Sequence, residues 1–154
     1  MHPNLEGCTD LKCPVGGLLP VDGVLKEKEF LHQLDLPNAD ERKGLYVIKN
    51  TMATSVMVGC AMELLSVVQE NHAYYGVKTS MEIAVHPYNH EDGAFSSPED
   101  SGSIILDGLG HIIVGLLTSG AGDAVDRDMT YLTPYFWLEE KIKATFPHSF
   151  LFRT

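Results

Sequence analysis

The sequence lacks any run of about eighteen apolar residues, so no segment is predicted to cross a membrane as a helix. Its N-terminus also lacks the basic start and apolar core of a secretion signal, which favours a cytoplasmic location. Basic residues are scarce: 11 Lys and Arg stand against 21 Asp and Glu, for a net charge of -10, and they gather in no stripe. These absences predict neither a membrane nor a nucleic acid as a partner.

Cysteine is rare as well. The three cysteines, Cys8, Cys13 and Cys60, are an odd number at spacings that suggest no disulfide framework, so reduced thiols are expected. Cys8 and Cys13 lack the second Cys or His pair that a zinc site needs. The segment 86–92 holds two histidines and two acids, but Pro87 argues against a helical ligand pair and no third ligand is identifiable. The sequence therefore predicts no metal and no cofactor.

The amino-acid composition of the chain changes near residue 44. The first 43 residues read as a loop-rich arm punctuated by Pro and Gly, with one helix predicted over 24–34 and Asp22 as its cap. The rest contains six segments rich in Val, Ile, Thr and Tyr, separated by turn residues, at 45–50, 54–68, 77–87, 102–107, 111–119 and 129–134. The connections are too short for crossover helices. This pattern predicts an all-β domain over 44–154, either a small antiparallel barrel or a sandwich.

Two local signals complete this expectation. Leu106–Gly110 contains an Asp-Gly pair between two apolar strands, which predicts a tight hairpin. After the last strand, Thr133 is a plausible cap and Pro134 suits a first helical position, so an amphipathic C-terminal helix is predicted to follow.

The segment 95–103, FSSPEDSGS, has the most chemical content. A serine between an aspartate and a glycine, in a turn before a buried strand, can expose its hydroxyl while nearby backbone N–H groups point at one spot. The same composition is common in polar turns for conformational reasons alone. From the residues by themselves, a nucleophile with its oxyanion hole and an ordinary turn both remain open.

The order of segments after residue 44 resembles the C-terminal barrel of the trypsin-like (chymotrypsin-fold) serine peptidases. In chain order these segments are the strand 47–59, the turn PEDSGS, the strands IILDG, IIVGLLTSGAG and TYLTP, and the helix WLEEKIKATF. The likeness is strongest to uncharacterised fungal sequences of that kind and covers 44–146. It implies a six-strand antiparallel Greek-key barrel with a C-terminal helix.

The resemblance also implies roles for individual residues. Ser101 takes the position of the nucleophile, Asp100 stabilises the turn, and Gly102 is the small residue behind the serine. The residues expected to contact substrate are Phe95 and Ser96 at the base of the specificity pocket, and Thr118, Ser119 and Gly120 along a strand that pairs with the substrate backbone.

Two departures from the family pattern bear on activity. Glu99 stands where the family has a glycine whose N–H is an oxyanion donor, and a side chain in left-handed space there would cost about 1 to 2 kcal/mol. The family's base His and its Asp belong to a preceding barrel, for which 43 residues are too few. None of the seven histidines, His2, His32, His72, His86, His90, His111 and His148, stands at the position of that base.

Three functional hypotheses follow. The chain is a serine-peptidase-like enzyme whose base comes from an unexpected place or another chain; or it is a non-catalytic relic that binds a peptide or protein; or it is the C-terminal portion of a longer enzyme. Membership of the family is favoured and turnover by this chain is not, because Glu99 and the missing base act independently. An apolar barrel flank is expected to be covered by the arm at 18–36, or else to drive self-association.

Overall fold

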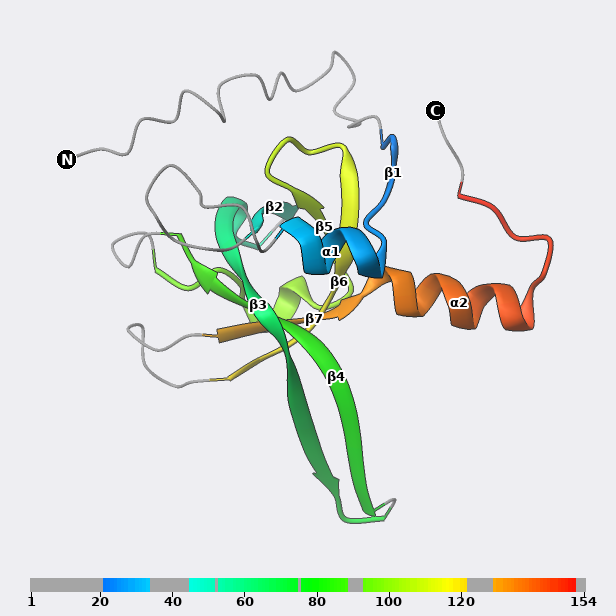
Figure 1. The fold of residues 1–154 in the computed structure, drawn as a ribbon. Helices are drawn as coiled ribbons and strands as arrows, with labels where there is room; N and C mark the ends of the chain where they lie inside the picture. Colours follow the sequence, from blue (N-terminus) through cyan, green and yellow to red (C-terminus); the bar gives the residue numbers. More distant parts are fainter. Residues whose placement is uncertain are drawn as a thin grey trace.

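The computed structural model describes residues 21–33, 45–51, 53–74, 76–88, 93–121 and 129–151. The six predicted strands are confirmed (Figure 1). They are β2 (Leu45–Thr51), β3 (Ser55–His72), β4 (Gly76–Pro87), β5 (Ile104–Asp107), β6 (Ile112–Ala121) and β7 (Met129–Pro134). The protein is therefore mainly β, with helix α2 (Tyr135–Thr145) after the last strand.

The strands are arranged as a Greek-key barrel. Their order in the sheet is β6-β5-β2-β3-β4-β7, and β6 also pairs with β7, which closes the circle. All these pairings are antiparallel, but closure is uneven: β2 and β5 share only the pairs 47–107 and 48–106. β5 and β6 are joined at the predicted Asp-Gly turn, where the Asp107 carboxylate accepts hydrogen bonds from the N–H groups of His111 and Ile112, at 2.8 and 2.9 Å.

The core lies inside the barrel, because alternate residues of each strand face inward. Its buried members are Val47, Ala61, Ile83, Val85, Phe95, Ile105, Val114, Leu117 and Leu132. At Gly59 of β3, neighbouring core atoms approach the backbone very closely. A Cβ at this position would lie 2.5 Å from the Val85 side chain and 2.9 Å from the His86 carbonyl oxygen. Only a residue without a side chain fits there.

The N-terminal arm contributes to this core. The short strand β1 (Gly23–Val24) pairs in parallel with β6, and helix α1 (Glu27–Gln33) follows. Leu25 and Phe30, 2% and 1% exposed, join the main core cluster. The prediction that the helix begins at Val24 with Asp22 as its cap was wrong, because the backbone at 23–25 bonds to β6 instead, with the Leu25 N–H 2.8 Å from the Ile113 carbonyl.

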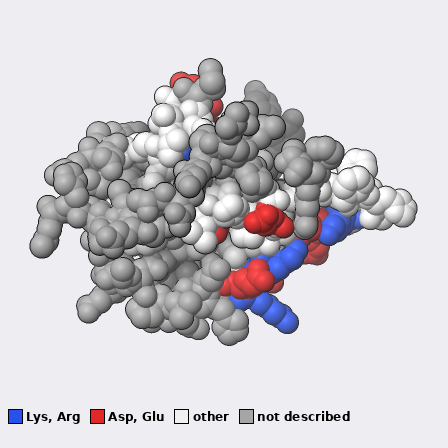
Figure 2. Space-filling view, turned by 90° about the horizontal axis from the view of Figure 1, so that it is seen from above, with Lys and Arg blue, Asp and Glu red and all other residues white. Residues whose placement is uncertain are grey.

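Helix α2 begins one residue later than predicted. Pro134 is its N-cap rather than its first residue, and Thr133 is no cap because its backbone still pairs with Leu116 of β6. The helix packs through the partly buried Phe136 and has no fully buried residue. Acidic and basic side chains lie next to one another on one face of the molecule (Figure 2). Glu139 of α2 contacts Lys26, just before α1, at 2.8 Å and Lys143 of α2 at 2.6 Å. No helix in the described ranges is long and apolar enough to cross a membrane.

A hairpin projects from the barrel (Figure 1). The pairing of β2 with β3 ends at Ala61, and the pairing of β4 with β7 begins at Ile83. Beyond these points, 66–72 of β3 pair with 76–82 of β4, the register shifts between Ala61 and Leu65, and no other strand in the described ranges pairs with 62–72 or 76–82. We call these two segments the β3–β4 arm.

Candidate functional site

The candidate site is built around the serine turn, residues 97–103, between the core residue Phe95 and strand β5. Ser97 caps a single 3₁₀ turn, η3 (Pro98–Asp100), in which the Asp100 N–H donates to the Ser97 carbonyl at 3.0 Å. Gly102 has a φ of +85°, a conformation that L side chains rarely adopt. Its N–H donates to the Leu117 carbonyl at 2.7 Å, which ties the turn to β6.

Asp100 is the buried anchor of the turn. One carboxylate oxygen, Oδ2, accepts hydrogen bonds from Lys49 Nζ at 2.7 Å, from Thr54 Oγ1 at 2.7 Å and from the Ser97 N–H at 3.0 Å. The Lys49 and Asp100 side chains are both 0% exposed. Lys49 also donates to the hydroxyl groups of Thr51 and Thr54. An ion pair enclosed in this way fixes the turn to strand β2.

The environment of Asp100 keeps it ionised. Burial by itself raises the pKa of the carboxyl group, but the hydrogen bonds from Lys49, Thr51, Ser97 and Thr54 together outweigh burial and hold the pKa well below its usual range. Asp100 is thus ionised at neutral pH. The resemblance implied that Asp100 stabilises the turn, and its contacts agree with such a role.

Ser101 follows this anchor and is exposed to solvent. Its Oγ donates a hydrogen bond to the Thr118 carbonyl at 3.4 Å, so the structure brings together the predicted nucleophile and the predicted substrate strand. No histidine whose side chain the structure describes hydrogen-bonds to Ser101. His86 lies on β4 opposite Cys60, and His111 contacts Asp22 at 3.5 Å. His2 and His90 lie outside the described residues.

Glu99 does not adopt the left-handed conformation expected of it. Among the described non-glycine residues, only Ser55 has a positive φ. Glu99 instead sits within the 3₁₀ turn, so the expected backbone strain is absent. A 3₁₀ turn directs its N–H groups toward carbonyls three residues earlier, as the Asp100 N–H shows.

The predicted substrate strand has one open edge. Ser119 and Gly120 pair with Tyr131 and Thr130 of β7 on one side, whereas β5 pairs with β6 no further than Leu116. In the described ranges, no strand pairs with residues 119–120 on the β5 side. On the paired side, the Thr118 hydroxyl donates to the Tyr131 carbonyl of β7 at 3.0 Å.

The two residues predicted at the base of a specificity pocket are well packed. Phe95 is 0% exposed and belongs to the core. The Ser96 hydroxyl lies 2.7 Å from the hydroxyl of Thr130, which is also 0% exposed. Their roles in substrate binding stay predictions.

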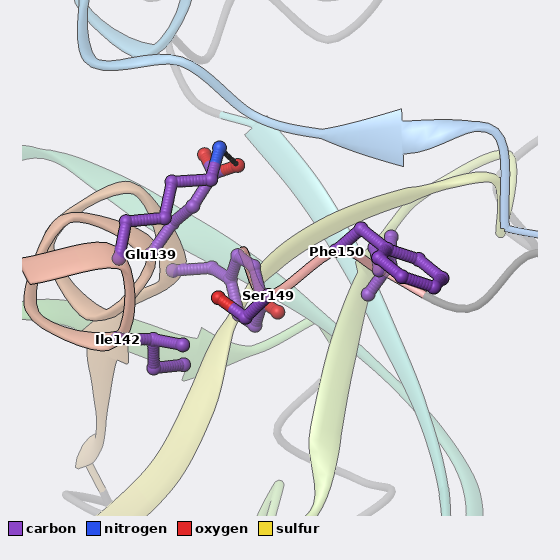
Figure 3. Close-up of a pocket in the computed structure, with 7 residues that line it drawn as sticks. Glu139, Ile142, Ser149 and Phe150 are labelled. Carbon is purple, nitrogen blue, oxygen red and sulfur yellow. Dashed lines mark hydrogen bonds and ion pairs between the residues drawn. The ribbon is translucent and has the colours of Figure 1, made fainter. Parts of the chain in front are cut away.

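A separate groove of about 220 Å³ lies between α2 and the C-terminal segment (Figure 3). Its lining residues are Tyr135, Glu139, Ile142, Lys143, Ser149, Phe150 and Leu151. It shares no residue with the serine turn or β6, so it is no part of the candidate site.

Sequence reasoning missed Lys49 and Thr54. A signal for Lys49 was available: it is two residues from Val47, so both face the barrel interior, where a lysine requires an acidic partner. Thr54 carries no such signal because it lies in the turn between β2 and β3.

Comparison with known proteins shows what this architecture is. No protein-family model and no curated protein matches the sequence. Among solved structures, the chymotrypsin of Cellulomonas bogoriensis matches with a TM-score of 0.53 over 87% of this chain, at 19% identity. The chain has a chymotrypsin-like fold. A glutamic-acid-specific serine protease that uses a histidine triad in substrate binding matches with a TM-score of 0.52 over 87% of the chain, at 15% identity.

This chain matches only part of the length of each of these two proteins. The chain spans 57% of the Cellulomonas enzyme and 56% of the glutamic-acid-specific protease. The predicted resemblance to the trypsin-like fold is therefore confirmed at the level of fold. The stronger likeness to fungal sequences stays a prediction.

Proposed function

We propose that this chain is a serine-peptidase-like domain with Ser101 at the nucleophile position, and that it does not turn over substrate by itself. The observation that carries the first half is the buried Lys49–Asp100 pair directly before an exposed serine. A buried ion pair at this position holds a surface turn in one conformation, and pre-organised geometry is what a nucleophile turn requires.

Two features of the site support the second half. The Ser101 hydroxyl donates to a backbone carbonyl, and a serine without a base is a poor nucleophile near neutral pH. The 3₁₀ turn through Pro98–Asp100 also places Glu99 outside the left-handed conformation expected at this position. We infer that the Glu99 N–H is not a ready oxyanion donor, a loss that costs about a hundredfold to a thousandfold in rate.

The test is labelling with a fluorophosphonate probe, read by intact mass. The Ser101→Ala variant gives the background, and an active chymotrypsin run in parallel shows that the probe is competent. We expect labelling of the folded protein no higher than that background. Rapid labelling that disappears in Ser101→Ala would overturn the inactivity and start a search for the base that serves it.

The Glu99→Gly variant separates the effect of the altered residue 99 from the effect of the missing base. Because the base is a separate requirement, this substitution alone is not expected to restore hydrolysis of a peptide ester. Appreciable turnover in the variant, absent from Glu99→Gly/Ser101→Ala, would mean that a base acts on Ser101 after all.

A second candidate function is binding of an extended peptide along β6. The open edge at residues 119–120 lies beside Ser101 and favours this candidate, because an unpaired edge accepts a further strand. Titration with uncharged N-acetylated pentapeptides should shift the amide resonances of residues 118–120 in NMR spectra, while those of α2 stay in place. Saturating peptide without shifts at 118–120 would remove this candidate.

A further inference from the structure

Glu82 is a buried acid without a partner of opposite charge. The buried charged side chains of the described ranges are Lys49, Asp100 and Glu82. Lys49 and Asp100 form an ion pair with each other, whereas no ion pair of the described residues includes Glu82, which is 6% exposed. Glutamate is almost never fully buried unless it is paired, because burial removes the water that solvates its charge. This environment favours a cation beside Glu82.

The hydrogen bond that Glu82 receives is a weak one. The Thr118 hydroxyl lies 3.4 Å from Oε2 of Glu82 and 3.0 Å from the Tyr131 carbonyl oxygen. A hydroxyl group has one proton to donate, and hydrogen bonds between two oxygens are usually about 2.5 to 3.0 Å long. The proton is therefore directed mainly at Tyr131, so the Glu82 carboxylate can still accept hydrogen bonds from a ligand.

Glu82 lies beside the candidate site. It is the residue of the β3–β4 arm that precedes the core residue Ile83, and successive side chains of a strand point to opposite faces, so Glu82 lies outside the barrel core. Thr118 connects it to Ser101, because the Thr118 hydroxyl contacts Glu82 while the Thr118 carbonyl accepts the Ser101 hydroxyl at 3.4 Å. Thr118 is exposed and directly precedes the open edge at 119–120. A peptide bound along this edge would pass next to the carboxylate.

We propose that Glu82 selects peptides with a basic side chain at the β6 edge. A lysine or arginine can lay its apolar stem along the protein surface and bring its charged end to the carboxylate. The contact would supply the charge-assisted hydrogen bonds that Thr118 does not. With a net charge of -10, the whole chain also attracts a cationic ligand. The inference rests on the peptide-binding function proposed above, and it concerns a different place from the predicted pocket base at Phe95 and Ser96, which carries no charge.

The test compares pentapeptides that differ by one charge. N-acetylated, C-amidated peptides carry a single lysine at each position in turn, and matched peptides carry norleucine at the same position. Binding is followed through the amide resonances of residues 118–120, at about 150 mM salt, where screening weakens long-range attraction to the acidic chain. We expect at least one lysine peptide to bind about tenfold or more tightly than its norleucine counterpart.

Glu82→Gln tests the residue itself. Glutamine keeps the size of the side chain and can still accept a hydrogen bond from Thr118, but it carries no charge, so the preference for lysine should fall to about twofold or less. Glu140→Gln, which removes an exposed acid from α2, lowers the net charge by the same amount and should keep the preference. The wild-type comparison of lysine with norleucine does not depend on the folding of either variant.

The outcomes separate this inference from the function on which it rests. Equal binding of every lysine peptide and its norleucine counterpart to the wild type would overturn the inference and leave peptide binding in place. A preference for lysine that a folded Glu82→Gln protein retains would assign the recognition to another acid, which also overturns it. No shifts at 118–120 with any of the peptides would remove the peptide-binding candidate and this inference together.

Discussion

Replacing Lys49 by methionine tests how the serine turn is held. The substitution preserves most of the side-chain volume but leaves the Asp100 carboxylate, 0% exposed, without its cation. Removing one partner of a buried ion pair typically costs about 3 to 5 kcal/mol, because the remaining charge is buried and uncompensated. The hydrogen bonds from Thr54 and Ser97 remain, so we expect a loss near the lower end of this range.

The assay is urea unfolding followed by far-ultraviolet circular dichroism at pH 7. A domain of ordinary stability has about 5 to 15 kcal/mol in total, so the midpoint should fall markedly. Lys28→Met removes an exposed lysine of α1 and should change the free energy of unfolding by about 0.5 kcal/mol at most. The double variant Lys49→Met/Asp100→Leu removes both charges and should recover most of the loss.

The pH dependence gives a second readout. Because the folded-state pKa of Asp100 is lowered, its contribution to wild-type stability is present above the unfolded pKa of about 3.9 and is lost as the pH falls below it. In Lys49→Met, burial is no longer opposed by the ammonium group but only by the remaining hydrogen bonds, so that contribution becomes smaller. The difference between the two proteins should therefore shrink as the pH falls from 7 toward 3. A folded Lys49→Met protein within about 1 kcal/mol of wild type at pH 7 would refute this reasoning.

Two other substitutions probe the packing of the barrel. Gly59→Ala would place a Cβ 2.9 Å from the His86 carbonyl oxygen, which cannot rotate away, so we expect a loss of about 1 to 3 kcal/mol in thermal or urea unfolding; Gly23→Ala, whose nearest neighbour lies at 3.7 Å, should cost less than Gly59→Ala. Phe30→Ala should cost about 3 to 5 kcal/mol because the ring is 1% exposed. The 55% exposed Leu31 is its control, and equal effects of the two alanine substitutions would mean that α1 does not pack as described.

The strands could be predicted because each has a local signature. In β7, for instance, burial alternates from Met129 to Pro134, as expected of β-rich sequence with one face in a core. The start of α1 could not be predicted in this way. Val24 fits a helical pattern, but its backbone pairs with Ile113 of β6. The residues around Val24 carry no signal of a contact so distant in the sequence.

In the candidate site too, the local turn could be predicted and the distant contact could not. The turn around Ser101 stands out because its residues are contiguous and precede a buried strand. The partner of Asp100 was not predictable by the same means, because Lys49 lies on β2 and meets the carboxylate only once the barrel has formed. The backbone conformation of residue 99 was not predicted either. The family pattern suggested a left-handed residue there, whereas the structure has a 3₁₀ turn, with Pro98 at its first position.

The parallel pairing of β1 with β6 has a consequence for the order of folding. Gly23 and Val24 bond to Ile112 and Ile113, so this contact closes a loop that contains most of the barrel. The entropy lost in closing a loop grows with its length, and contacts at long sequence separation slow folding. The local hairpins β2–β3 and β3–β4 should therefore form first, and Leu25 and Phe30 should be among the last residues to enter the core.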